Sequence, residues 1–417
     1  MFNRKAWLTF VLVVVLVMGI TGVMSAEKIK IVVADWEPEG RGPISTILQK
    51  CREDHPELEI EQVYYGSDHF DKLLVNIATG GGPDIYLWWD FPALAEGGFA
   101  VDLLPYMLES EVLHPDNFFP GALNYGGKYK DGIYATPHSF TPRAILVNLD
   151  AFDAAGLAYP TDDWTWDEFR NIALKLTRPD ENKYGFDWYW GVYNIGGFIW
   201  GNGGDFVNED ATQAIGYIDS PETIEAVTWL ANLRLLDGVM PLSGALQSGQ
   251  GFATGNIAMM ETGAWDLLVS KEANPNIRMM SVVPPAPEGK SPGSVLHSSG
   301  WVVSPNCQNI EAAMIVLEYL SGPIGQREMV IQDAALPTLP SVVTEFQLWN
   351  DPESGGFIRA VEYATTTHWF LRTPRWNSEY QGVVQDALNQ IFDGQAAPAT
   401  ALRAAGEALQ RIMDSYK

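Results

Sequence analysis

The chain has 417 residues, more than the roughly 250–300 at which a single hydrophobic core stops growing, so two domains are expected. Hydrophobic residues make up 47% of the chain and charged residues 19%, a composition typical of folded globular proteins. The formal net charge is −26. Such an acidic surface repels nucleic acid and anionic lipid, so we expect no nucleic-acid partner.

The first 26 residues have the plan of a secretory signal peptide. Arg4 and Lys5 precede the apolar run 6–20, and small residues follow it up to the expected cleavage point near residue 26. A transmembrane anchor is the alternative, because the apolar run is long enough to cross part of a bilayer. We favour cleavage. No cysteine lies near the cleavage point, so we expect an exported protein of the periplasm or cell surface without a lipoprotein anchor.

Past this segment, predicted strands and helices alternate. Strands are expected at 29–34, 58–65 and 85–87, with helices at 42–55 and from residue 72 to a glycine-proline stop. This βαβαβ order is typical of a parallel or mixed sheet covered by helices, which makes the predicted fold class α/β.

The exit of the third strand suggests a binding site. Gly80–Pro83 end the preceding helix, and the apolar strand then leads directly into Trp88, Trp89 and Asp90. Ligands of open α/β sheets bind outside the carboxyl ends of the strands. Indole faces stack on sugar rings, and a carboxylate accepts hydrogen bonds from hydroxyl groups. An ordinary helix–loop–strand with two partly buried tryptophans is the alternative, and this segment alone does not decide between them.

Prolines mark three places where the chain is expected to cross between domains. The strand-like segment 133–148 is interrupted by Pro137 and Pro142, and two further proline-rich stretches occupy 282–292 and 336–340.

The remaining helices carry recognisable start signals. Thr165 and Glu168 stand in capping-box register before a helix predicted over 167–176. Ser220 and Pro221 begin another, predicted over 221–237. Other predicted elements are a short strand ending at 259–265 and helices over 304–320, 379–392 and 398–415.

Patterns for metal binding and covalent catalysis are missing from the sequence. The six histidines are scattered, and none forms an H-E-x-x-H pair. The segment 289–291 resembles the end of a phosphate loop, but Pro284 stands where a glycine is required, and no G-x-S-x-G elbow occurs. We therefore expect no metal, no cofactor and no enzyme activity. Cys51 and Cys307 form either one disulfide or two thiols; their separation does not decide, and we favour thiols.

Aromatic residues are abundant at loop positions. Many of the 15 tryptophans stand beside a glycine, a carboxylate or an arginine at a strand exit. For any single tryptophan a place in the core is the simpler interpretation, but their convergence on such loops favours a sugar-binding cleft. Charged groups there would orient hydroxyl groups through strong hydrogen bonds. The segments concerned are Trp36–Glu37, Trp88–Asp90, Trp188–Trp190, Trp200 with Asn202 and Asp205, Trp265–Asp266, Trp301 and Arg375–Trp376.

The succession of motifs resembles one known family. ATGGGPDIY, DGIYATPHSF, TWDEF, WGNGGDF, IDSPETIEAVTWL and FATGNIAMMETGAW occur in that order across nearly the whole mature chain. They look like the extracellular solute-binding proteins of sugar ABC transporters, the group that contains maltose-binding protein.

The resemblance implies two α/β lobes with a ligand cleft between them and hinge closure on ligand. Each lobe would be a mixed or parallel sheet flanked by helices. Lobe one would comprise residues 27–136 and 287–336, and lobe two residues 143–283 and 341–417. The crossings would lie near 137–142, 284–286 and 337–340, where the prolines stand.

The candidate ligand-binding residues follow from the aromatic loops and from motif-by-motif matching to the family. Thr141 is added because it falls at the first crossing, where the family contacts its ligand. The full set is Trp36, Glu37, Trp88, Trp89, Asp90, Thr141, Trp200, Asp205, Trp265, Asp266, Trp301, Arg375 and Trp376.

The resemblance implies a monomeric protein that binds a mono- or oligosaccharide and presents it to the membrane permease subunits of an ABC importer. An exported glycoside hydrolase using two cleft carboxylates is the alternative from another class. A non-sugar ligand such as a polyamine, a metal chelate or glycerol phosphate is a third possibility, because this scaffold hosts several ligand classes.

Overall fold

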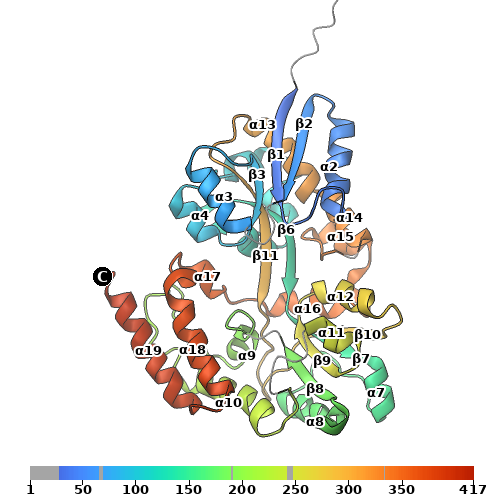
Figure 1. The fold of residues 1–417 in the computed structure, drawn as a ribbon, viewed down its shortest axis with the longest axis vertical. Coiled ribbons are helices and arrows are strands. Elements are labelled where there is room, and N and C mark those ends of the chain that lie inside the picture. Colours follow the sequence, from blue (N-terminus) through green and yellow to red (C-terminus); the bar gives the residue numbers. More distant parts are fainter. Residues whose placement is uncertain (1–27, 65–68, 189–190, 242–247, 333) are drawn as a thin grey trace, which may run out of the picture.

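The computed structural model describes residues 28–64, 69–188, 191–241, 248–332 and 334–417, so the predicted signal peptide lies outside the described residues. The described chain forms two α/β lobes arranged along the long axis of the molecule (Figure 1). The predicted α/β class, with sheets flanked by helices, is confirmed. Within the described ranges, no helix combines the length and apolar character needed to cross a bilayer.

Lobe one is built on a five-stranded mixed sheet. Its order is β2–β1–β3–β11–β6, with β2 and β3 parallel to β1, and β11 antiparallel to both β3 and β6. The first three strands come from the N-terminal βαβαβ segment, as their alternation predicts. The strands are β1 (Ile29–Asp35), β2 (Leu58–Tyr64), β3 (Ile85–Trp88), β6 (Thr136–Pro142) and β11 (Leu296–Val303).

Lobe two is built on a four-stranded mixed sheet. Its order is β10–β7–β9–β8, in which β7 is antiparallel to both neighbours and β8 is parallel to β9. The strands are β7 (Ala144–Asn148), β8 (Tyr184–Trp188), β9 (Ile257–Thr262) and β10 (Met279–Val282). A short hairpin with two residues in each strand, β4 (Lys128–Tyr129) and β5 (Gly132–Ile133), is separate from both sheets.

Helices cover both sheets (Figure 1). Those of lobe one are α2 (Gly42–Asp54), α3 (His69–Ala78), α4 (Phe91–Gly97), α5 (Leu104–Glu109), α6 (Pro120–Gly126), α13 (Ile310–Ser321), α14 (Pro323–Ile331) and α15 (Pro340–Glu345). Those of lobe two are α7 (Leu149–Ala155), α8 (Trp166–Leu176), α9 (Gly196–Gly201), α10 (Pro221–Leu235), α11 (Ser248–Ala253), α12 (Trp265–Ala273), α16 (Gly355–Ala360), α17 (Trp369–Arg372), α18 (Gln381–Phe392) and α19 (Pro398–Asp414).

Two clusters of buried apolar side chains form the core. The smaller cluster fills one face of the lobe-one sheet beneath α2 and α13 and includes Ile31, Leu48 and Val316. The larger cluster begins on the other face of that sheet, at residues such as Tyr86, and continues without interruption through lobe two to Leu409. The two lobes therefore share a continuous apolar interior.

The predicted helix starts are confirmed at α8 and α10 and wrong at α13. Thr165 and Glu168 form the capping box of α8, and the Ser220 side chain accepts from the backbone N–H of Thr223 at the start of α10. The helix predicted from residue 304 begins instead at Ile310, capped by Asn309. Residues 304–309 contain a proline and form turns closed by side-chain hydrogen bonds, which compete with a helix.

The first connection between the lobes differs from the predicted one. Thr136–Pro142 is not a free crossing but the edge strand β6, which pairs with β11. An edge strand tolerates prolines because the missing N–H groups face no partner strand. The chain enters lobe two at Arg143, directly before β7.

The other two connections also lie later in the chain than predicted. The backbone N–H of Trp166 donates to Ala286 O at 2.8 Å, and Lys290 Nζ donates to Asn202 O at 2.9 Å, so the segment after β10 packs on lobe two until β11 begins at Leu296. Val342 of α15 belongs to the lobe-one core, so the last passage follows α15. The prolines mark constrained backbone and do not mark the lobe on which it packs.

Both cysteines are free. Cys51 is buried on α2, and Cys307 is half-buried in the turn before α13. Burial raises the pKa of both thiols, to about 12 for Cys51 and about 11 for Cys307, which keeps them protonated.

Substituting Gly293 should destabilise the second connection where it crosses α9. A Cβ atom at this position would lie 2.2 Å from Gly197 O and 2.7 Å from Gly201 N, both of which are backbone atoms. We expect Gly293→Ala to lower the free energy of unfolding by roughly 1–3 kcal/mol, measured by urea denaturation. Gly382→Ala in α18 is the control, because a Cβ there meets nothing within 4 Å. Equal stability of the two variants would contradict the close packing.

Candidate functional site

A cavity of about 400 Å³ lies between the lobes. Indole rings come from both sides, Trp36 and Trp89 from lobe one and Trp265 from lobe two, and strands β6 and β11 supply hydroxyl groups. The described lining residues include no carboxylate, lysine or arginine. They are Trp36, Trp89, Ser139, Thr141, Tyr193, Trp265, His297, Ser298, Ser299 and Phe370.

Trp89 follows β3 and rests on its neighbour. The rings of Trp88 and Trp89 are stacked, with centroids 5.2 Å apart and planes inclined by 15°. Trp88 is only 5% exposed, and its Nε1 donates to the backbone O of Asp90 at 3.2 Å. Trp88 therefore supports Trp89 from behind and does not line the cavity.

Trp36 stands on a loop that the buried Asp35 holds in shape. The Asp35 carboxyl accepts from the backbone N–H of Glu37 at 2.5 Å and from Gln62 Nε2 at 2.9 Å. Burial raises the pKa of Asp35 to about 7 despite these two donors. The Trp36 ring is 40% exposed and makes an edge contact with His138, at 6.0 Å between centroids.

The hydroxyl groups of the site follow from strand register. Ser139 and Thr141 alternate along β6 and pair with Ser299 and His297 of β11, so all four share one face of the sheet. Burial, with additional repulsion from Arg143, holds the pKa of His297 well below its usual range, so its ring is neutral at physiological pH. This wall thus offers hydroxyl groups and a neutral imidazole. The described residues hold no cluster of three or more His, Cys, Asp or Glu that could bind a metal ion.

Several of the predicted ligand residues lie in the protein interior. Trp301, Trp376 and Asp266 are each 0% exposed. Trp301 belongs to the smaller core cluster, Trp376 stacks on Trp369 at 5.5 Å, and Asp266 accepts a hydrogen bond from Thr262 Oγ1. None of the three lines the cavity.

Three other predicted residues lie outside the cavity wall as well. Asp90 accepts from Asn377 Nδ2 at 2.6 Å, which links lobe one to the segment before α18. Glu37 packs against Gly42 at the start of α2, and burial raises the pKa of its carboxyl. The Arg375 guanidinium lies over the Tyr416 ring, 4.0 Å from its centroid.

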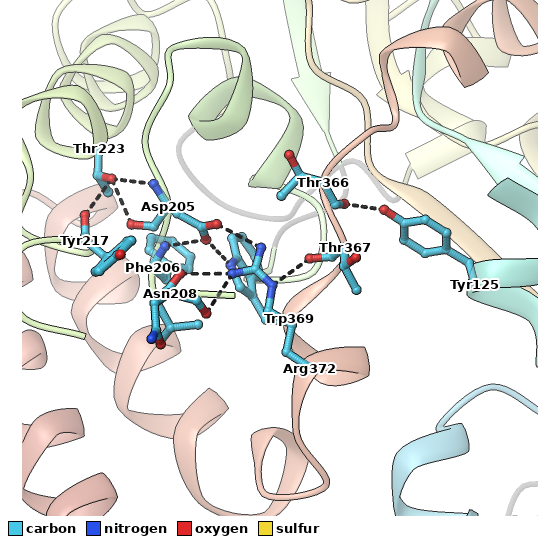
Figure 2. A network of polar contacts seen from close by, with 11 residues as sticks. Tyr125, Asp205, Phe206, Asn208, Tyr217, Thr223, Thr366, Thr367, Trp369 and Arg372 are labelled. Carbon is cyan, nitrogen blue, oxygen red and sulfur yellow. Dashed lines mark hydrogen bonds and ion pairs between the residues drawn. The ribbon is translucent and has the colours of Figure 1, made fainter. Parts of the chain in front are cut away.

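Asp205 is the centre of a polar network that joins two segments of lobe two (Figure 2). Its carboxylate accepts from Trp369 Nε1 at 2.5 Å, from the backbone N–H of Phe206 at 2.7 Å and from Arg372 Nη2 at 2.8 Å. Its backbone is held by Thr223 Oγ1. Trp200 packs beside this network, with its ring centroid 5.0 Å from that of Trp369. Both predicted residues thus hold structure together and do not line the cavity.

The same network fixes α17 beside the cavity, and the segment before α17 is also bonded to lobe one. Arg372 Nε donates to Thr367 O at 2.8 Å, and the Tyr125 hydroxyl of α6 donates to Thr366 O (Figure 2). These contacts hold Phe370, which the sequence analysis did not single out, at the cavity wall.

Sequence reasoning also missed Tyr193, His297 and three serines. Tyr193 belongs to no predicted element. In the segment Leu296–Trp301, three consecutive polar residues, His297, Ser298 and Ser299, interrupt an otherwise apolar strand, and this run was the available signal.

Replacing Asp205 should lower the stability of the apo protein rather than its affinity for ligand. Asp205→Ala would leave the Arg372 side chain, which is 4% exposed, without its carboxylate partner. We expect the free energy of unfolding to fall by about 3–5 kcal/mol, measured by chemical denaturation of the apo protein. Asp210→Ala, at an exposed position nearby, serves as the control. An unchanged apo stability with weaker ligand binding would instead restore Asp205 to the ligand site.

Glu261 should make the protein less stable as the pH rises. Burial raises the pKa of Glu261 from 4.5 to about 7, a neighbouring Asp266 adds to this, and Arg143 opposes it. Between these values the folded state holds a proton that the unfolded state has lost, so stability falls through this window and the cost is complete above about pH 7. The difference in unfolding free energy between Glu261→Gln and the wild type should therefore move in favour of the variant by roughly 1–3 kcal/mol as the pH rises from 5 to 8, measured by urea titration. The exposed Glu272→Gln should gain nothing, and parallel pH profiles for wild type and Glu261→Gln would contradict the assignment.

Solved structures of solute-binding proteins share this fold. The structure superposes with a TM-score of 0.80 on an ABC substrate-binding protein from Listeria monocytogenes in complex with cycloalternan, at 24% identity and covering 93% of this chain and 99% of that one. A solute-binding protein from Thermotoga lettingae bound with α-D-tagatose gives a TM-score of 0.78 at 22% identity, covering 93% of this chain and 100% of that one. These likenesses establish the shared two-lobe fold.

Sequence comparison points the same way. A maltotriose-binding protein from Pyrococcus abyssi is 24% identical over 326 residues, which cover 77% of this chain and 68% of that protein. The family model described as bacterial extracellular solute-binding protein matches residues 40–327, which is more than half of the chain. The chain therefore belongs to the family of bacterial extracellular solute-binding proteins.

Proposed function

We propose that this protein binds a neutral oligosaccharide in the cavity between its lobes and presents it to the permease subunits of an ABC importer. The observation that carries the proposal is the convergence of Trp36, Trp89 and Trp265 on one cavity whose remaining wall offers hydroxyl groups. Indole faces provide large apolar contact surfaces, and hydroxyl groups donate and accept hydrogen bonds as sugars require. The sugar ligands of the related proteins support the same class of ligand.

The charge of the lining favours a neutral ligand. A phosphate or carboxylate ligand needs cationic partners, and the described lining residues include neither lysine nor arginine. A polyamine needs carboxylates, and none lines this part of the cavity either. Both non-sugar alternatives are therefore less well supported than a neutral sugar.

The hydrolase alternative is not supported. Glycoside hydrolysis requires two carboxyl groups on either side of the scissile bond, whereas the described wall contains none. Membership in a solute-binding family also indicates transport without chemical change of the ligand. Family membership implies export, and we retain the periplasm or cell surface as the proposed location and a monomer as the proposed state. One relative, from Streptomyces antibioticus, is an uncharacterized lipoprotein.

A thermal-shift screen against neutral sugars tests the proposal. A ligand present at 100 times its Kd stabilises the folded protein by about 2.7 kcal/mol, which gives a clear rise in Tm. Uronic acids, sugar phosphates and polyamines form the comparison set, and chromatography of the incubated sugars tests for cleavage. Stabilisation by a charged compound alone, or release of smaller sugars, would overturn the proposal.

Trp265→Ala should weaken binding of the sugar found in this screen by roughly 1–3 kcal/mol, because the ring supplies contact surface on the lobe-two side of the cavity. Isothermal titration calorimetry measures the affinity, and the Tm of the apo protein reports stability. Trp301→Ala is the matched control, since this buried ring should cost about 3–5 kcal/mol of stability and leave the affinity of the folded fraction unchanged. The reverse pattern would place the ligand elsewhere.

A further inference from the structure

The Trp265 ring is held from the protein side by groups that do not line the cavity. The Cζ atom of Arg143 lies 4.6 Å from the ring centroid, a cation–π distance, and Arg143 is 3% exposed. A Cβ at Gly263 would come within 2.2 Å of the ring atom Cζ3 and within 2.4 Å of Thr141 Cγ2. The ring therefore lies so close to the Gly263 backbone that a larger residue there would collide with it, and the Arg143 guanidinium lies over the ring.

Arg143 is fixed at both ends. Its backbone N–H donates to Val295 O at 2.8 Å, and its backbone O accepts from Ser294 Oγ at 2.9 Å, so it ties the first connection between the lobes to the second. Its Nη2 donates to Asn194 Oδ1, and its Nε lies 3.8 Å from Glu261 Oε1.

Such a location is costly for a cation. Removing a charged group from water is unfavourable unless partners compensate, and an apolar side chain of the same length would fill the space without that cost. The guanidinium nevertheless lies over the Trp265 ring, which lines the cavity from lobe two, and Arg143 itself is not among the lining residues.

We propose that Arg143 is a positioning residue for ligand binding, which sets the orientation of Trp265 and does not itself contact the ligand. The inference rests on the proposed function, because it assigns to Trp265 the ligand contact on lobe two. It also connects the ligand wall with the two chain segments that link the lobes, since the same residue is bonded to both.

A double-mutant cycle tests the proposal. The four proteins are the wild type, Arg143→Met, Trp265→Ala and the double variant, each titrated calorimetrically with the sugar selected by the thermal-shift screen. Arg143→Met should weaken binding roughly 3–30-fold, as expected for the loss of a cation–π contact that orients the ring. In the Trp265→Ala background the same substitution should have no further effect. An equal loss in both backgrounds, or no loss in the first, would overturn the proposal.

Folding is controlled separately, because Arg143→Met leaves Glu261 without its cation. The pair Arg143→Met with Glu261→Gln removes both charges together and should show the same loss of affinity, whereas Glu261→Gln alone should bind within about 2-fold of the wild type. Loss of affinity in Glu261→Gln alone would assign the effect to the ion pair and overturn the role of the guanidinium.

A spectroscopic readout distinguishes this inference from the proposed function. In protein labelled with 5-fluorotryptophan, the Trp265 resonance is assigned by its absence in Trp265→Phe. Arg143→Met combined with Glu261→Gln should shift the Trp265 resonance in the apo protein and leave the resonance of the buried Trp301 unchanged. An unshifted Trp265 signal would overturn the inference even where the sugar binds, whereas a wild type that binds no sugar would overturn the proposed function and leave the ring orientation still measurable.

Discussion

The antiparallel pairing of β6 with β11 determines how the rest of the molecule is arranged. The two strands complete the lobe-one sheet at its edge; β6 leads directly into β7 of lobe two, and β11 follows directly from a segment packed on lobe two. Their register fixes which side chains face the cavity, since His297 pairs with Thr141 and Ser299 with Ser139. The β6–β11 pairing thus forms the edge of the lobe-one sheet, lies at the junction of the two lobes and provides the polar wall of the cavity.

The tryptophans of this chain have two roles: some are buried in the core, and others line the cavity directly beside them. Trp88 and Trp89 are adjacent in sequence and stacked in space, yet one is buried and the other faces the cavity. Trp369 is buried and shares its Nε1–H with Asp205, which keeps the polar end of the indole bonded inside the core. Of the rings that line the cavity, Trp89 is therefore backed by another ring and Trp265 by a guanidinium.

How much of this was predictable from sequence depends on the range of the interactions concerned. The α/β class, the N-terminal βαβαβ unit and the caps at Thr165 and Ser220 depend on neighbours within a few residues, and they were found. Of the site, Trp36, Trp89, Thr141 and Trp265 were placed at strand exits or a crossing, and the structure brings them to one cavity. Whether each contacts a ligand remains a proposal.

The rest could not be read locally. Trp301 follows the cavity-lining Ser299 by only two residues in the same strand, but a register shift lies between Ser299 and Gly300, and the Trp301 side chain is buried in the core. From sequence, Asp205 was a reasonable candidate ligand residue, because its partner Arg372 is more than 160 residues away in the chain. Phe370 lies at the cavity wall on α17, whose neighbouring residues Trp369 and Arg372 are bonded to this same network. Burial and pairing at long range decide such cases.

The continuous apolar cluster that runs from Tyr86 to Leu409 has a mechanical consequence. A molecule with two separate cores would lose one lobe at a time under heat or tension, whereas side chains shared between lobes make local melting of either one expose the other. We therefore expect both lobes to unfold together, and a ligand bound at the cavity to stabilise the C-terminal helix α19 as well, since Leu409 belongs to the same cluster. For an exported protein exposed to proteases, this coupling lowers the population of half-unfolded forms that could be cut.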